Sequence, residues 1–489
     1  MRVRTRVALV AGAAAAGLAA VRRFGRSRSD RAFVQVTGSR TARTARIASL
    51  GARRAQADAW HRARRSFVSA PRRAELDAEH QLRSAADVAA VLGEMKGALA
   101  KLGQMVSYLD ETMPEPMREA LASLQQDIPP MAPELAAEVV QRELGRPPHE
   151  LFDAWDDVPI AAASIGQVHR AITRDGRAVA VKVQYPGVDA AIRADLDNTD
   201  LLFRLIGLAF SGLDPKTVVD ELRERLTEEL DYTIEARNQE LFADYYAEHP
   251  FIHVPAVLHE LSTARVLTTE LATGARFDEL MRWSQSERDL AAETLFRFVF
   301  RGIYRIAAFN GDPHPGNYLF APGGRVTFLD FGLVKHYTPA EVKLFTDLIV
   351  AMCIEHDIPH FRRLIEDGGV LPRNAPVSDQ QVQDYFGHFY EFVLDDHEVT
   401  FDAEYASGTV RQMFDLSSPT AAVARVSNVP SAFVVAQRIN LGLHAVLAQL
   451  HATANWRRIA EEIWPFVNAP PSTELGEQEA EWLRTHPRA

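Results

Sequence analysis

Hydrophobic residues follow two different periods along the chain. Between residues 84 and 109 they recur every three to four positions, which is the spacing of an amphipathic helix. Between residues 167 and 183 they largely alternate with polar ones, and the Asp175-Gly176 pair in this stretch is typical of a hairpin turn. The same signals predict a strand at 264–271 and a short hairpin at 318–329.

Helical spacing dominates the rest of the chain. It is predicted at about 187–210, 215–248 and 277–310, and over most of the chain after residue 339, which ends in a polar tail from residue 469. Strands followed mainly by helices predict an α+β enzyme with two lobes, the second of them mostly helical. The expected parts are a basic arm at 1–73, a helical extension with a Pro-rich linker at 74–133, a first lobe with a helical insert at 134–273, and a second lobe at 274–489.

Composition places the chain among ordinary globular proteins. Of its 489 residues 47% are hydrophobic and 24% are charged, which excludes the collagen-like and disordered classes. A single cysteine, Cys353, excludes a disulfide framework and a cysteine-based zinc site, and its apolar neighbours predict a buried, inert thiol. His249 and His253 have a metal-compatible spacing, but no third ligand is evident, so core or surface histidines are expected.

Charge is divided unevenly between the arm and the rest of the chain. Residues 1–73 hold 18 Arg, no Lys and two acids, whereas the remainder carries 36 basic and 63 acidic residues. The arm therefore has a net charge of +16 and the remainder −27, which indicates a polyanionic partner for the arm. No nucleic-acid-binding module is visible, so an anionic membrane surface is favoured over nucleic acid.

The arm also contains an apolar stretch at 7–21. As a helix it would reach about 22 Å, which is short of the roughly 30 Å hydrocarbon core of a bilayer. It predicts a peripheral membrane anchor on a cytoplasmic protein. A signal or transit sequence and a plain disordered or helical tail remain as alternatives.

Candidate phosphate chemistry begins in the second lobe. Asp312 and Asn317 lie five residues apart in the segment GDPHPGN, and Asp330-Phe331-Gly332 follows an apolar strand. An Asp, four residues and then an Asn is the spacing of a kinase catalytic loop. In that chemistry Asp312 orients the attacking hydroxyl or water, while the oxygens of Asn317 and Asp330 hold Mg²⁺.

Lys182 ends the strand sequence VAVK and matches the kinase lysine that pairs with the nucleotide phosphates. Its acidic partner is expected on a helix, where Glu229, Asp231 and Glu235 are candidates. Asp231 and Glu235 share a helix face and would repel each other unless a cation faced them. A kinase would have a Gly-rich loop before this strand, but here the residues are Ala161, Ala162, Ala163 and Ser164, whose side chains keep the backbone farther from phosphate.

In combination these motifs resemble the UbiB/AarF atypical kinase-like family, whose members are linked to quinone and isoprenoid-lipid metabolism. The resemblance covers about residues 80–345. It rests on the KxGQ segment at 101–104, the Ala-rich loop, VAVK, the ExD motif at 229–231, DPHPGN and DFG. It implies an atypical two-lobed protein-kinase-like fold with ATP and Mg²⁺ as cofactors.

The resemblance also implies roles for individual residues. Glu235 would pair with Lys182, and the backbone from Glu270 to Ala272 would form the hinge against adenine. Lys101 and Gln104 of the KxGQ segment would reach over the active site to the ExD acids, Glu229 and Asp231. In this family that segment covers the place where a protein kinase receives its peptide.

The sequence departs from protein kinases in one feature and from many members of the UbiB/AarF family in another. A helix is predicted from Pro339, which leaves no room for a long activation loop after Gly332. The C-terminal region also lacks the hydrophobic spans of many bacterial quinone-linked members, so membrane attachment is expected through the arm. We therefore expect ATP hydrolysis or phosphorylation of a small lipid-like molecule, with lipid-biosynthesis proteins as partners. The alternatives are a nucleotide-binding scaffold for lipid-modifying enzymes and an aminoglycoside- or choline-type phosphotransferase, in which Lys101 would have no role.

Overall fold

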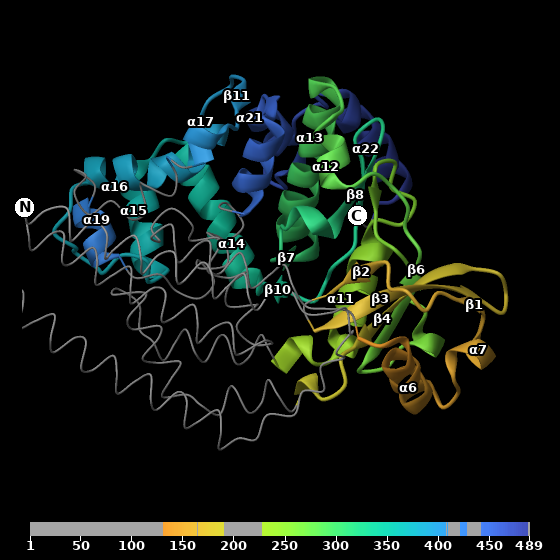
Figure 1. Cartoon of the computed structure of the whole chain (residues 1–489). Coiled ribbons are helices and arrows are strands. Elements are labelled where there is room, and N and C mark those ends of the chain that lie inside the picture. The colour runs from red at the N-terminus through yellow and green to blue at the C-terminus, as the bar shows by residue number, and fades with distance from the viewer. Residues whose placement is uncertain are drawn as a thin grey trace, which may run out of the picture. The chain divides into compact units, whose positions relative to one another are not determined.

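A computed structural model describes residues 131–163, 165–189, 227–406, 408, 421–427 and 442–487 (Figure 1). The basic arm, the extension up to residue 130 and most of the helical insert lie outside these residues. So do Lys101, Gln104 and Ser164, and the roles predicted for them stay predictions. Within the described ranges, no helix is both long enough and apolar enough to span a bilayer.

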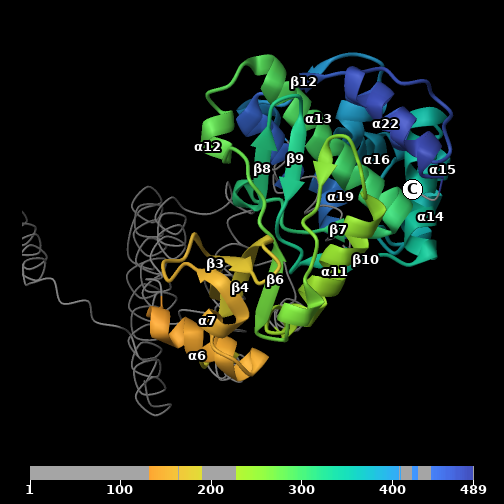
Figure 2. The same cartoon turned by 90° about the vertical axis from the view of Figure 1, so that its right-hand side faces the viewer.

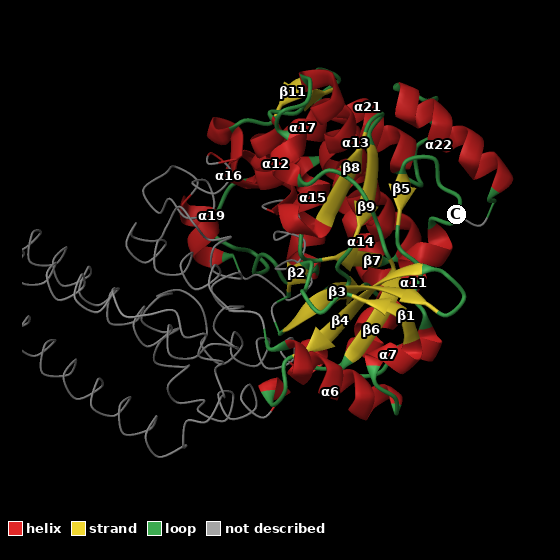
Figure 3. Ribbon diagram, turned by 45° about the vertical axis from the view of Figure 1, so that its right-hand side comes forward, coloured by secondary structure: helices red, strands yellow, loops and turns green. Residues whose placement is uncertain are grey.

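The first lobe contains an antiparallel sheet in which β1, β3, β4 and β6 are neighbours in that order, and β2 pairs with β3 (Figure 3). The strands are β1 (Phe152–Trp155), β2 (Ala161–Ala162), β3 (Gly166–Thr173), β4 (Ala178–Gln184) and β6 (Val266–Glu270). Gly176 lies in the turn between β3 and β4 with φ of 85°, a left-handed conformation that glycine adopts without strain. The predicted hairpin and the predicted strand at 264–271 are confirmed.

The two faces of β4 have different partners. Its valines are fully buried against helix α6 (Pro133–Leu144), and α7 (Pro148–Leu151) lies beside α6 on the same side of the sheet (Figure 2). Successive side chains of a strand point to opposite faces, so Lys182 points away from these helices. Helix α11 (Tyr232–Tyr245) meets Lys182 on that second face.

The second lobe is centred on the buried helix α13 (Gln285–Arg301). A short helix, α12 (Phe277–Leu280), precedes it, and a π-helical turn at Gly302–Ile306 leads from it into strand β7 (Ala308–Asn310). The prediction that helix dominates over 277–310 is therefore confirmed for most of this range and wrong at its end. Strand β10 (Val334–His336) pairs antiparallel with β7, and this pairing fixes residues 308–310 as a strand.

The predicted hairpin at 318–329 is confirmed as β8 (Tyr318–Ala321) and β9 (Arg325–Phe328), with β5 (Ile252–His253) parallel to β9. The remainder of the lobe is mostly helical, as predicted, and Cys353 is buried in its core, where burial raises the thiol pKa to about 12. Its other elements are α14 (Pro339–Ile349), α15 (Ile358–Asp367), α16 (Asp379–Phe386), α17 (Glu391–Leu394), β11 (Val399–Thr400), α19 (Ala421–Val426), β12 (Thr453–Ala454), α21 (Trp456–Ile463) and α22 (Glu474–Thr485).

The polar tail predicted from residue 469 is wrong from Glu474 to Thr485, because α22 is a docked helix. Leu475, Glu479 and Trp482 are spaced three to four residues apart, lie on one face, and are all buried. Only two of these three side chains are hydrophobic, and one carries a charge. The apolar periodicity of this segment is therefore too weak to predict a packed helix from the sequence.

Candidate active site

Lys182 and Glu235 form the centre of the site. The Lys182 Nζ donates to both carboxylate oxygens of Glu235, at 2.7 Å and 2.9 Å, and lies 4.0 Å from an oxygen of Asp330. The ammonium also lies 5.0 Å from the ring centre of Tyr232. The ion pair that the resemblance implied is thus present and joins strand β4 to helix α11.

Helix α11 holds Glu235 in place from its first turn. The carboxylate of Asp231 accepts from the backbone N–H and the hydroxyl of Thr233, so Asp231 is the N-cap of the helix. Of the three candidate acids, Glu235 alone is in direct contact with Lys182. The carboxylate of Glu229 still lies close enough to contribute to raising the pKa of Glu235.

Electrostatics keep the lysine charged. Burial lowers the pKa of Lys182, but the carboxylates of Glu235 and Asp330 outweigh it, and the net pKa lies well above the usual value. Burial raises the pKa of Glu235, the Lys182 ammonium opposes this rise, and Asp330 adds to it. Among the described groups, the Lys182 ammonium thus lies next to two carboxylates, those of Glu235 and Asp330, in the arrangement of charged groups that is typical of functional sites.

The Ala-rich segment forms a tight edge beside this pair. Ala161 and Ala162 lie in β2, and the Ala163 N–H donates to the Gly166 carbonyl at 2.9 Å. A Cβ on Gly166 would lie 2.3 Å from the Val183 carbonyl oxygen and 3.0 Å from the Tyr232 hydroxyl. Only glycine lets the start of β3 approach β4 so closely, next to Lys182.

The Asp312 loop is held by its own hydrogen bonds. The Asn317 side chain donates its amide N–H to the Asp312 carbonyl at 3.0 Å, and the His314 N–H donates to the same carbonyl at 2.8 Å. The Asn310 side chain accepts from the Asp312 N–H at 3.3 Å and donates to the Asp330 carbonyl at 2.5 Å. Asn310 therefore ties the two predicted catalytic segments together.

The DFG segment is anchored by helix α11. Phe331 is fully buried with its ring 5.2 Å from that of Phe242, and its carbonyl accepts from the Asn238 side chain at 3.2 Å. Asn238 lies on α11, one turn after Glu235. Asp330 accepts from the Gly332 N–H at 2.9 Å, and its side chain stays 32% exposed, so a ligand can reach it.

The two predicted metal ligands lie on neighbouring chain segments. The Leu329 N–H donates to the Asn317 carbonyl at 3.0 Å, which places Asn317 beside the residue that precedes Asp330. Across the described part of the chain, no cluster of three or more His, Cys, Asp or Glu residues could hold a metal. One amide and one carboxylate suit Mg²⁺, which completes its shell with waters and phosphate oxygens, so the donor set fits the predicted cation.

The predicted hinge residues follow directly from the sheet. Glu270 ends β6 opposite Val179, and its half-exposed carboxylate lies 3.3 Å from His253. After Ala272 the chain enters the second lobe, where Ala275 forms an antiparallel bridge with Phe320 of β8. The segment is placed to connect the lobes, and the adenine contact predicted for it stays a prediction.

Comparisons with known proteins identify the family. The model of the ABC1 atypical kinase-like domain matches residues 123–363. The solved structure of Rv3197 from Mycobacterium tuberculosis in complex with erythromycin is 32% identical, with a TM-score of 0.58, and the match covers 80% of this chain and 98% of that one. The chain belongs to the ABC1 atypical kinase-like family. The resemblance to UbiB/AarF proteins and the α+β kinase-like fold are thereby confirmed.

Two curated ABC1 relatives come from organelles. The mitochondrial atypical kinase COQ8B of Rattus norvegicus is 36% identical over 50% of this chain and 46% of its own length. The chloroplastic ACTIVITY OF BC1 COMPLEX KINASE 1 of Arabidopsis thaliana is 33% identical over 57% of this chain and 42% of its own. This chain therefore spans less than half the length of these relatives.

Sequence reasoning missed several residues of this ABC1 site. Asn238, Asn310 and His336 hold the DFG segment, with the His336 ring 3.0 Å from the Asn238 amide oxygen. Asn238 follows Glu235 by three positions, a spacing that places the two on neighbouring parts of one helix surface. That spacing was visible in the sequence, whereas nothing near Asn310 or His336 marked those residues.

Proposed function

We propose that this protein is a Mg-ATP-dependent atypical kinase or ATPase. The observation that carries the proposal is the bidentate contact of Lys182 with Glu235, 4.0 Å from Asp330. A lysine held charged beside an accessible aspartate is suited to bind phosphates and their metal ion. The surrounding elements, β4, α11 and the DFG segment, are those that supply these groups in kinases.

Each residue then has a defined task. Lys182, oriented by Glu235, contacts the α- and β-phosphates, and Asn317 and Asp330 hold Mg²⁺ by their side-chain oxygens. Bound Mg²⁺ neutralises the charge that develops on the transferred phosphoryl group. Asp312 orients the attacking water or hydroxyl. The Ala161–Ala163 segment borders the phosphates, and the backbone of Glu270 to Ala272 contacts adenine.

We propose water or a small lipid-like hydroxyl as the acceptor, in quinone or isoprenoid-lipid metabolism. The KxGQ segment, with Lys101 and Gln104 near Glu229 and Asp231, would exclude a peptide. A relative solved with erythromycin supports a small molecule as ligand. The basic arm at 1–73 would hold the protein on the cytoplasmic side of an anionic membrane.

Nucleotide binding tests the proposal directly. Mg-ATP at 100 times its Kd should stabilise the wild type by about 2.7 kcal/mol, seen as a higher melting temperature. Asp330→Asn should lose most of this shift, while Asp278→Asn, an exposed carboxylate elsewhere, should keep it. If neither ATP nor ADP raises the melting temperature of the wild type, the proposal is wrong.

Product identification then separates the reaction types. Turnover with a lipid extract and anionic liposomes should yield ADP together with phosphate or a phosphorylated lipid. Tight ATP binding with no turnover, with or without liposomes, would favour the scaffold. Full activity of Lys101→Ala would favour the aminoglycoside- or choline-type phosphotransferase.

A further inference from the structure

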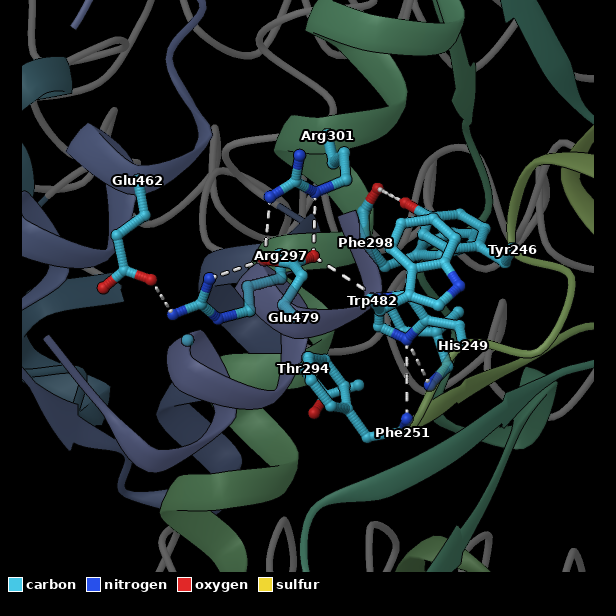
Figure 4. Close-up of polar contacts among 12 residues, drawn as sticks. Tyr246, His249, Phe251, Thr294, Arg297, Phe298, Arg301, Glu462, Glu479 and Trp482 are labelled. Carbon is cyan, nitrogen blue, oxygen red and sulfur yellow. Dashed lines mark hydrogen bonds and ion pairs between the residues drawn. The ribbon is translucent and has the colours of Figure 1, made fainter. Parts of the chain in front are cut away.

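Helix α22, which lies outside the matched family region, packs against the end of α11 (Figure 4). The Trp482 Nε1–H donates to the Ala247 carbonyl at 3.0 Å, just after the last turn of α11. The Trp482 ring lies 4.5 Å from that of His249 and 6.4 Å from that of Tyr246. These contacts hold the carboxyl end of the helix that carries Glu235.

A buried charge network fixes α22 to α13 (Figure 4). Glu479 accepts from Arg297 at 2.7 Å and from Arg301 at 2.7 Å and 2.8 Å, and all three side chains are at most 2% exposed. Arg297 also donates to Glu293 and to Glu462, so its charge is fully surrounded. Such a network tolerates little displacement, because moving one partner leaves a buried charge unpaired.

Helix α11 therefore has two fixed ends. Near its start Glu235 contacts Lys182, and near its end Tyr246 and His249 contact α22. The eleven residues from Glu235 to Tyr245 span about 15 Å of continuous helix. A helix of this length moves as one body, so a displacement at α22 is transmitted to Glu235.

We infer that Glu479 and Trp482 are positioning residues, which fix the end of α11 and thereby place Glu235 against Lys182. The mechanical part of this inference stands on the described contacts alone. Its consequence for nucleotide rests on the proposed function. Loosening α22 would then lower ATP affinity and turnover without touching a nucleotide-binding group.

Hydrogen exchange on the full chain measures the mechanical part without ATP. Trp482→Leu should speed the exchange of amides 234–240 in α11 by about threefold to tenfold. Trp482→Phe keeps the ring contacts, loses the hydrogen bond to Ala247, and should give an intermediate effect. The matched control is Trp456→Leu, which removes another buried tryptophan whose ring N–H donates to a backbone carbonyl, that of Val399, and whose ring contacts are with Phe296 and Phe401 rather than with α11 or α22.

A double-mutant cycle measures the functional part. Trp482→Leu should lower kcat/KM for ATP by about threefold to tenfold in the wild-type background and have no further effect beside Glu235→Gln. A general loss of stability would act equally in both backgrounds. Equal α11 exchange in Trp482→Leu and Trp456→Leu, at matched stability, overturns the inference. Absence of ATP binding by the wild type overturns the proposed function instead, and the exchange result still decides the inference.

Discussion

Two clusters of charged side chains lie at opposite ends of α11, and they differ in how their charges are satisfied. At one end Lys182 faces Glu235 and Asp330, and the Asp330 side chain is 32% exposed. At the other end Arg297 and Glu479 are at most 2% exposed, and each binds several partners of opposite charge. The first cluster can still accept a ligand, whereas the second is complete.

This difference separates a ligand-binding site from a purely structural contact. We call the second cluster the structural joint; it consists of Glu293, Arg297, Arg301, Glu462 and Glu479. Buried ion pairs that satisfy one another contribute rigidity but leave no group for chemistry. A charged lysine beside a partly exposed aspartate is an arrangement that suits phosphate and metal chemistry. Charge alone therefore does not mark a functional site in this protein, because exposure and balance distinguish the two.

Removing Arg297 should have the largest effect on stability. Arg297→Met leaves Glu479, Glu293 and Glu462 without their shared cation, and we expect the free energy of unfolding to fall by about 3–5 kcal/mol. Urea unfolding measures it. Arg458→Met, whose ion pair with Asp396 is half-exposed, should have a much smaller effect on the free energy of unfolding. Equal losses in the two variants would contradict the comparison.

Neutralising Glu235 should instead act mainly on activity. Glu235→Gln keeps the side-chain shape but removes the charge that orients Lys182, and we expect kcat/KM for ATP to fall by about 10- to 100-fold, or about 1.4–2.7 kcal/mol. Steady-state kinetics measure this. Glu240→Gln changes an exposed acid on the same helix, paired with His259, and should leave kcat/KM within about twofold. Similar losses in both variants would show that α11 responds to any change of charge.

The sequence was sufficient where the signal was local. The alternating stretch that contains Lys182 predicted a strand, which the structure has as β4. The spacing of Asp312, Asn317 and Asp330 predicted the second half of the site, and the roles of these residues stay predictions. Both rest on residues that lie within 18 positions of one another in the sequence. The choice of Glu235 over Glu229 and Asp231 came from the family resemblance, because a helix N-cap and an ion-pair partner are both acids in the sequence.

The structural joint could not be predicted from the sequence, because its residues on α13 and α22 lie far apart in the chain. Arg297 and Glu479 are 182 residues apart, and each looks like an ordinary solvated position on a helix. The sequence from residue 469 is mostly polar and predicted a tail, although the segment contains the docked helix α22. Pairing of distant charges depends on the packing of α13 against α22, which no local period records.

A glycine beside the site should have an intermediate effect. Gly166→Ala would place a methyl group 2.3 Å from the Val183 carbonyl, so β3 and β4 must separate, and we expect a loss of about 2 kcal/mol in urea unfolding. Gly387→Ala is the control, since nothing lies within 4 Å of its added Cβ and its φ of −55° suits alanine. Wild-type stability of Gly166→Ala would mean that this approach of the two strands is not required.

The smallest expected effect is the pH dependence of the joint, through His249. Burial lowers the pKa of His249, and its Nδ1 accepts from the N–H groups of Phe251 and Ile252, so the folded protein holds it neutral. The unfolded chain takes up a proton below about pH 6.5, which favours unfolding as the pH falls. Between pH 7 and pH 5 this should cost less than about 2 kcal/mol. Urea unfolding at both values should show the decrease in the wild type and in His253→Gln, which changes a half-exposed histidine, and a smaller decrease in His249→Gln.

The pKa of Glu479 is also lowered, by Arg301 and Arg297 against the effect of burial, so its contribution is lost only below the ordinary carboxyl range, outside this window. An equal decrease in all three proteins would mean that His249 is not held neutral at the joint.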